Sequence, residues 1–224
     1  MPAVRDLSYE AWLQHSFGEP VRAHGNPWFF DENPPWWDPQ PPVAIEYFTK
    51  LFSTIEQSLA GFSDAQIAQG LTYLLNTSAS GDNGWFLSGS TPVEKRLTCV
   101  AAIEHIFTDL FAPRCAAVLG HIDEPGAKPL NMVCYMWWDV FPCLALPDDP
   151  DCDNLHRTAI DVMRRALQLD SIACQEAALH GLGHWARHRP DHVLPVVDAF
   201  LADGCGRRAE LISYAHSARC GCIL

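Results

Sequence analysis

The sequence predicts an all-α protein, and three observations lead to this fold class. Apolar residues recur at helical spacing over residues 43–60, the pattern of a helix that buries one stripe. Helix-start signals stand at Ser63 with Gln66, a capping pair, and at Thr91 with Pro92, which places proline at the first helical position. No alternating β-branched run in the sequence is long enough for a convincing strand.

The first element is an irregular arm rich in proline and tryptophan, assigned to residues 1–42. A short helix is expected near residues 8–17, and seven prolines then interrupt regular structure because each removes a backbone donor and fixes φ. Between them stand several aromatic residues: Trp28, Phe29, Phe30, Trp36 and Trp37. The arm is expected to pack on the protein's own helices, or alternatively to form a lip that binds a partner.

Residues 43–224 are expected to form a single all-α domain. Helices are predicted over residues 43–60, 63–76, 132–141, 155–169 and 174–185, with another starting at residue 91. The acidic run over residues 148–153 lacks the glycine and distal glutamate of a calcium loop, so it is interpreted as a helix end and the cap of the next helix.

A cysteine-histidine spacing recurs along these helices. The segment Cys99–His105 is similar to Cys174–His180, and Cys134 opens a third apolar helix, 35 residues after the first cysteine and 40 before the last. The small residues of Ala177–Gly183 resemble the inner helix of HEAT-like repeats. Over residues 91–224 the resemblance implies a right-handed α-α superhelix, a stack of HEAT-like helical hairpins.

Composition and charge restrict the class of partner. The chain of 224 residues is 48% hydrophobic and 19% charged, which favours an ordered protein. Its net charge is −12, and residues 1–90 hold ten acidic and three basic side chains. Residues 91–153 hold ten and four, and residues 154–224 seven and eight. This field argues against binding nucleic acid and favours a basic protein partner.

The expected location is the cytoplasm. The first residues contain no apolar run of a secretory signal, and no window approaches the length needed to span a bilayer. Nine cysteines, most of them in apolar helical patterns, suit reduced thiols. No membrane partner is therefore expected.

The sequence pattern that most resembles a functional site is a row of potential metal ligands four residues apart: Glu176, His180, His184 and His188. This spacing places them along one side of a helix, and Glu176, His180 and His184 could hold Zn²⁺. Gly181 follows His180, so the gluzincin order is absent. Histidines on a packed helix more often hydrogen-bond to their neighbours, so the favoured interpretation contains no metal and no cofactor.

A second possible metal set consists of Cys205, His216, Cys220 and Cys222, but its spacing matches no zinc module, which favours reduced thiols. Nucleophile elbows, phosphate-cradling loops and dinucleotide fingerprints are missing from the sequence. No catalytic residue is therefore assigned and a non-enzyme is favoured, although a Cys–His pair distant in sequence stays open.

The favoured function is a non-catalytic protein-binding scaffold. Trp138 beside Asp139 would form an apolar anchor with an acidic rim, or alternatively a core tryptophan followed by a helix-end aspartate. The predicted partner-binding residues are Trp36, Trp37, Trp138 and Asp139. In general character the chain resembles bacterial immunity proteins, antitoxins that neutralise a basic toxin. The alternative is a metal-dependent enzyme or regulator that uses Glu176, His180 and His184.

Overall fold

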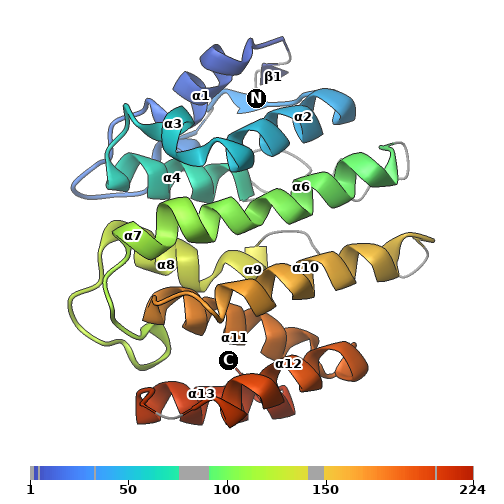
Figure 1. Ribbon diagram of the computed structural model, residues 1–224. Helices are drawn as coiled ribbons and strands as arrows, with labels where there is room; N and C mark the ends of the chain where they lie inside the picture. Colours follow the sequence, from blue (N-terminus) through green and yellow to red (C-terminus); the bar gives the residue numbers. More distant parts are fainter. Residues whose placement is uncertain are drawn as a thin grey trace.

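The computed structural model describes residues 3–4, 6–32, 34–75, 91–140, 149–204 and 206–223. Within them the fold is helical, and the helices lie in layers along the length of the molecule (Figure 1). The strands β1 (Ala3–Val4) and β2 (Trp36–Trp37) add one short parallel pairing. The all-α class predicted from the sequence is therefore confirmed.

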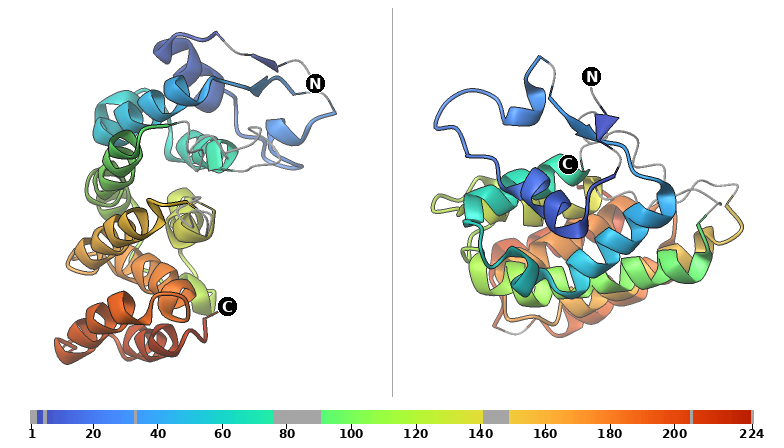
Figure 2. Two further views of the ribbon diagram at one scale, coloured as in Figure 1. Left: turned by 90° about the vertical axis from the view of Figure 1, so that its right-hand side faces the viewer. Right: turned by 90° about the horizontal axis from the view of Figure 1, so that it is seen from above.

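Most of the helices in the described residues form two rows (Figure 2, left). In the first row each helix packs against the next, in the order α2 (Pro41–Ser53), α6 (Val93–His105), α10 (Cys152–Ala166) and α12 (Pro190–Ala202). The second row has the order α4 (Asp64–Leu75), α8 (Pro129–Tyr135), α11 (Ile172–Ala186) and α13 (Ala209–Cys220).

The remaining described elements complete the layers. They are α1 (Tyr9–Phe17), the 3-10 turns η1 (Trp28–Phe30) and η3 (Gly120–Ile122), α3 (Ile55–Leu59), the π-helical segment η2 (Ile106–Phe111), α7 (Ala112–Arg114) and α9 (Trp137–Val140). None of the helices in the described ranges combines the length and the apolar character that a membrane span needs.

Local signals explain several helix ends. The Ser63–Gln66 capping pair forms, with the Ser63 backbone N–H donating to Gln66 Oε1 at 3.1 Å and the Gln66 N–H donating to Ser63 Oγ at 3.3 Å. The single helix expected over residues 43–60 is instead broken at Thr54, where φ is −129°. The Thr54 hydroxyl donates to the Lys50 carbonyl at 2.8 Å, a bond that competes with the helix ladder.

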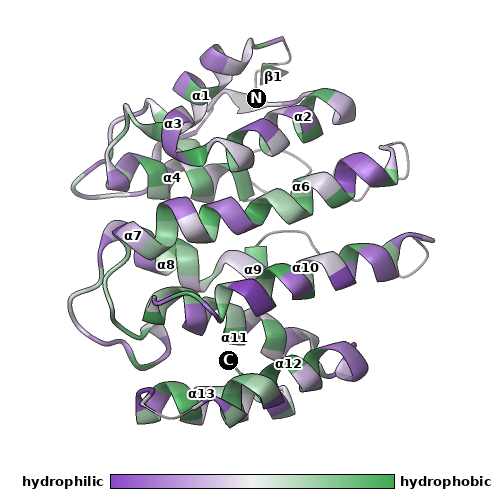
Figure 3. Ribbon diagram, viewed as in Figure 1, coloured by the Kyte–Doolittle hydropathy of each residue, from purple (hydrophilic) through white to green (hydrophobic). Residues whose placement is uncertain are grey.

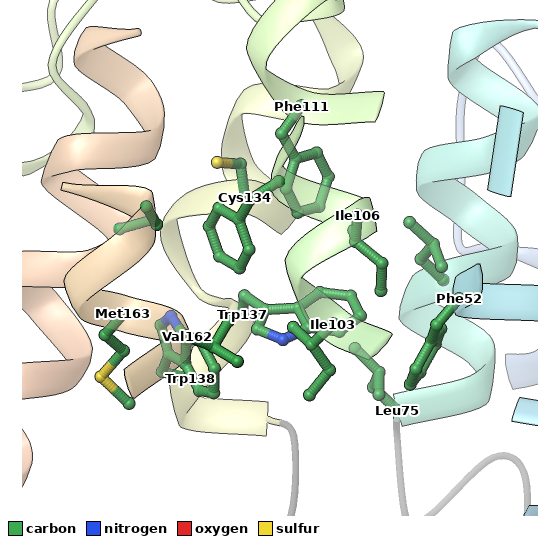
Figure 4. Packing of buried hydrophobic residues seen from close by; sticks show 14 of the residues in the cluster. Phe52, Leu75, Ile103, Ile106, Phe111, Cys134, Trp137, Trp138, Val162 and Met163 are labelled. Carbon is green, nitrogen blue, oxygen red and sulfur yellow. The ribbon is translucent and has the colours of Figure 1, made fainter. Parts of the chain in front are cut away.

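The core lies between the two rows, and Figure 3 shows hydrophilic residues along the outer sides of α6 and α10. Trp137 and Trp138 occupy its middle and belong to the same buried cluster as Val162 and Met163 of α10 (Figure 4), and Trp138 stacks on Phe107. This packing ties α9 to the helices on both sides of it.

The N-terminal arm packs on the first layer through its aromatic rings. Trp28, Phe29 and Trp37 are buried, and the Trp37 backbone N–H donates to the hydroxyl of Tyr73 on α4 at 3.0 Å. His15 Nε2 also lies 3.0 Å from that hydroxyl, so one tyrosine fastens two parts of the arm. Phe30 is half exposed.

Candidate metal centre

One group of potential metal ligands converges among the described residues. Asp139 of α9 meets His180 and His184 of α11, with one ligand atom from each within 4.8 Å of the others. The two histidines are one helical turn apart and therefore share a face of α11. The carboxylate reaches them because α9 packs against α11.

The two imidazoles and the carboxylate are in direct contact. Nε2 of His180 lies 2.8 Å from Asp139 Oδ2, and Nε2 of His184 lies 2.6 Å from Asp139 Oδ1. The two Nε2 atoms are 3.1 Å apart. Both rings therefore point the same type of nitrogen at one carboxylate.

Gly181 allows α9 to approach α11 this closely. A Cβ at this position would lie 2.6 Å from Cγ of Trp138, a contact that real side chains do not make. Trp138 fills the space instead, 3% exposed and stacked on Phe107 with ring centroids 5.8 Å apart. Its neighbour Asp139 is consequently held against the histidines.

Two tyrosines extend the contacts behind His180. Nδ1 of His180 lies 2.6 Å from the hydroxyl of Tyr214 on α13, and this hydroxyl lies 3.1 Å from that of Tyr135 on α8. Burial, and then the neighbouring Tyr135 hydroxyl, raise the pKa of Tyr214 above its usual value. Tyr214 therefore remains a neutral hydroxyl that fixes the orientation of the His180 ring.

The group is closed at His180 and open at the other two members. Side-chain exposure is 1% for His180, 21% for Asp139 and 39% for His184. Burial alone would raise the pKa of Asp139, but the hydrogen bond and charge of His180 and the charge of His184 outweigh it and lower that pKa. Burial lowers the pKa of His184, which favours the neutral imidazole that binds metals.

Glu176 lies on the same helix but serves another purpose. It is 1% exposed and accepts hydrogen bonds from the backbone N–H groups of Gly120 at 2.8 Å and His121 at 2.9 Å. Its Oε1 is also 2.5 Å from Nδ1 of His121. The structure thus replaces Glu176 by Asp139 in the predicted ligand set, while His188 is exposed and stands outside the group.

The predicted partner-binding residues are placed differently from the expectation. Trp37 is 2% exposed and Trp138 3%, so neither is the exposed anchor that the sequence suggested. Trp37 packs on Trp12 of the arm, and Trp138 is in the core. Asp139 faces the two histidines. The side chain of Trp36 lies outside the described part of the structure.

The second cysteine-histidine set has one member, Cys205, outside the described residues, while Cys220 at the end of α13 and Cys222 just beyond it are exposed. A hollow of about 460 Å³ lies elsewhere, between α2 and α6. Its charged lining is balanced between Glu46, Glu94, Lys50 and Lys95, which gives it no preference for a ligand of one charge.

Nothing in the sequence indicated that Asp139 lies beside the two histidines; the sequence singled it out only as the neighbour of Trp138. It lies 41 residues before His180, and only the crossing of α9 and α11 joins them. The chain matches no protein-family model, and comparison with curated proteins and with solved structures finds no significant match.

Proposed function

We propose that this protein binds one divalent transition-metal ion, of which Zn²⁺ is the representative, through Asp139, His180 and His184. The observation that carries the proposal is the convergence of two Nε2 atoms and one carboxylate within 4.8 Å. Imidazole and carboxylate suit zinc, and two histidines with one carboxylate also form the facial ligand set used by Fe²⁺. The metal-binding alternative from the sequence is retained, with Asp139 in place of Glu176.

The contact distances are close to those of a metal-bound set. Zn–N and Zn–O bonds of about 2.0 Å at tetrahedral angles separate neighbouring ligand atoms by about 3.3 Å. The two Nε2 atoms are 3.1 Å apart, and each lies 2.6 or 2.8 Å from a different oxygen of Asp139. Shifts of a few tenths of an ångström would therefore make room for the ion without moving a helix.

The surroundings support the required protonation states. If Nδ1–H of His180 donates to the Tyr214 oxygen, the lone pair of Nε2 faces Asp139 and His184. Such a partner behind a histidine ligand fixes its tautomer and increases its basicity. Asp139, with its lowered pKa, supplies the anionic ligand.

Three protein ligands leave at least one coordination position for water or a substrate atom. Solvent would reach such a position from the side where His184 and Asp139 are partly exposed. A bound zinc ion would supply Lewis acidity and lower the pKa of its water to about 7, which is the chemistry of hydrolytic centres. The proposal is thus a metal-dependent hydrolase or regulator on a helical scaffold.

If the three side chains are instead held together by hydrogen bonds alone, the protein should bind no metal ion. In that arrangement Asp139 accepts Nε2–H bonds from both histidines and Tyr214 donates to His180 Nδ1, so every group has a partner without an ion. Calorimetric titration of chelator-treated protein with ZnCl₂ separates the two. We expect one equivalent to bind, and the affinity to fall more than about 100-fold in Asp139→Asn and His184→Ala, because loss of an outer-shell partner alone already costs 10- to 100-fold.

The matched control is His188→Ala, which removes an exposed histidine just beyond the same helix. It should bind zinc as the unaltered protein does. Absence of zinc binding by the unaltered protein, or equal losses in His188→Ala and Asp139→Asn, would overturn the proposal.

We infer that the two rows form a HEAT-like α-solenoid with the right-handed superhelix that this repeat class adopts. The order of the helices supports this inference. The pairs α2/α4, α6/α8, α10/α11 and α12/α13 follow one another along the chain, and their equivalent members pack together.

A second candidate function is binding of a basic protein, as an immunity-type antitoxin binds its toxin. Met132 supports it, because it is 65% exposed and lines a hollow of about 210 Å³ with Asp123, Glu124 and Tyr135. The rim of this hollow also carries Lys128, and Glu124 is paired with Arg208, so Asp123 supplies the acidic group beside this apolar anchor, the chemistry that the sequence suggested for Trp138 and Asp139. The test is co-purification of one basic protein that high salt releases and that both Met132→Ala and Asp123→Lys weaken. A partner unaffected by these two changes would exclude this surface.

A further inference from the structure

The end of α13 carries two thiols on either side of a glycine: Cys220 is its last residue and Cys222 lies just beyond it. Cys220 and Cys222 are both exposed, and the Cys220 thiol donates to the Ser217 carbonyl oxygen at 3.2 Å. Gly221 between them ends α13 with φ of 65°, a left-handed conformation that turns the chain back. Cys222 Sγ also lies 3.6 Å from the Cys220 carbonyl oxygen. The turn therefore places both thiols at the surface, one residue apart in the chain.

We propose that Cys220 and Cys222 are a redox modification site, which closes to a disulfide on reaction with a small-molecule disulfide such as oxidised glutathione. Accessibility makes the reaction selective, since Cys99, Cys134 and Cys174 are 0% exposed. Among the described cysteines, only this pair combines exposure with a neighbouring thiol in the same turn.

The chemistry balances as two successive exchanges. The Cys222 thiolate attacks one sulfur of glutathione disulfide, the S–S bond breaks, and one glutathione thiolate leaves. The Cys220 thiolate then attacks the mixed disulfide at the Cys222 sulfur and expels a second glutathione thiolate. The protein loses two electrons and two protons, and one glutathione disulfide is reduced to two glutathione molecules.

The order of attack follows from the surroundings of the Cys220 thiol. The neighbouring Cys222 side chain, and then burial, raise the pKa of Cys220 above its usual value, and the Cys220 thiol donates to the Ser217 carbonyl oxygen at 3.2 Å, so Cys220 keeps its proton longer and acts in the second exchange. A disulfide that encloses a single residue departs from relaxed geometry, and exposed, strained disulfides are easily reduced. The modification is therefore reversible.

The pair is coupled to the metal centre through the next residue. Ile223 packs on Gly183 of α11, so closely that a Cβ there would lie 2.6 Å from Ile223 Cδ1. Gly183 directly precedes His184, and the Gly221 turn packs on Arg187 of the same helix end. Closing the disulfide pulls Cys222 toward Cys220 and displaces Ile223, which we expect to weaken zinc binding. This consequence rests on the proposed function.

The first experiment follows the thiols alone. Reduced protein is incubated with glutathione disulfide, the remaining thiols are blocked with iodoacetamide, and peptides are mapped by mass spectrometry. The peptide with Cys220 and Cys222 should lose two hydrogen atoms and carry no glutathione. Cys220→Ser should instead retain glutathione on Cys222, and the control Cys115→Ser should close normally. A stable glutathione adduct on the unaltered protein, or faster oxidation of another pair, overturns the site.

The second experiment measures zinc affinity of the reduced and oxidised forms by calorimetry, with the double variant Cys220→Ser plus Cys222→Ser as the control. Oxidation should lower the affinity by at least about 5-fold, the lower range of coupling between sites, and leave the double variant unchanged. A disulfide that forms without changing zinc affinity overturns the coupling. If reduced protein binds no zinc, the proposed function and the coupling fail together, while the peptide masses still decide the thiol site.

Discussion

Trp138 occupies the space that a side chain on Gly181 would need, so that a Cβ at residue 181 would lie 2.6 Å from Trp138 Cγ. This contact brings α9 directly onto α11. Because Asp139 follows Trp138, the same contact sets the distance between its carboxylate and the two histidines. Packing in the core and geometry at the candidate metal centre are therefore controlled by one glycine.

Gly181→Ala should consequently affect both stability and zinc binding. Overpacking against Trp138 should destabilise the fold by about 1–3 kcal/mol. The higher helix propensity of alanine offsets up to about 1 kcal/mol of this, so we expect a net destabilisation of about 1–2 kcal/mol. Urea unfolding and zinc titration measure the two effects. The control is Gly61→Ala, where an added Cβ meets nothing within 4 Å. If Gly181→Ala destabilises the protein but leaves zinc affinity unchanged, Gly181 does not control the geometry of the candidate metal centre.

Tyr214→Phe should weaken zinc binding while preserving the fold. It removes the hydroxyl 2.6 Å from His180 Nδ1, the partner that fixes the orientation of the ring. Loss of such a partner typically costs 10- to 100-fold in metal affinity. Tyr135→Phe is the control, since its hydroxyl contacts that of Tyr214 and lies one step further from the histidine. Its effect on titrated affinity should be smaller, and the reverse order would contradict this role.

Glu176→Gln should destabilise the protein without changing zinc affinity. The buried carboxylate accepts bonds from Gly120 and His121, and an amide would turn a donor toward one of these donors. We expect a loss of about 2–3 kcal/mol in urea unfolding, the value of hydrogen bonds to a charged group. A loss of zinc binding comparable to that in Asp139→Asn would restore Glu176 to the ligand set.

The acid dependence of stability should report the buried ion pair between Arg96 and Asp149, whose side chains are 2% and 6% exposed. The Arg96 hydrogen bond lowers the pKa of Asp149 below the value of 3.8 for a free aspartate. The stabilisation is therefore complete above pH 3.8 and is lost as the pH falls through the lowered pKa.

Asp149→Asn should cost about 2 kcal/mol at neutral pH, and its difference from the unaltered protein should shrink in urea unfolding below pH 3.8. Asp161→Asn, at an exposed carboxylate that pairs with Arg164 and Arg165, should change stability little. If the difference grows on acidification, the ion pair between Arg96 and Asp149 does not stabilise the fold in the way described.

Local signals in the sequence predicted the fold class and several helix ends, because a cap depends on residues a few positions apart. Ser63 and Gln66 show this directly. The break at Thr54 was missed because its hydroxyl can either face solvent or compete with the helix ladder. The pairing of residues 139 and 180 was missed because it depends on how two helices cross, and helix periodicity carries no information about crossing.

The histidines at 180 and 184 could be identified from their spacing, whereas their acidic partner could not. Glu176 fits the same spacing, but a helix position gives only the direction of a side chain and not what it meets. In the structure it meets the Gly120–His121 backbone. Trp138 likewise had two interpretations from sequence, and only the glycine across from it decides for the core.

X-ray absorption spectroscopy of the zinc-loaded, reduced protein tests the central claim most directly. We expect one zinc ion with only nitrogen and oxygen neighbours at about 2.0–2.1 Å, including the outer-ring scattering of two imidazoles. That signal should be absent from Asp139→Asn and His184→Ala and present in His188→Ala. A sulfur shell at about 2.3 Å, which would place the ion on the cysteines, or a protein that retains no zinc would contradict the account.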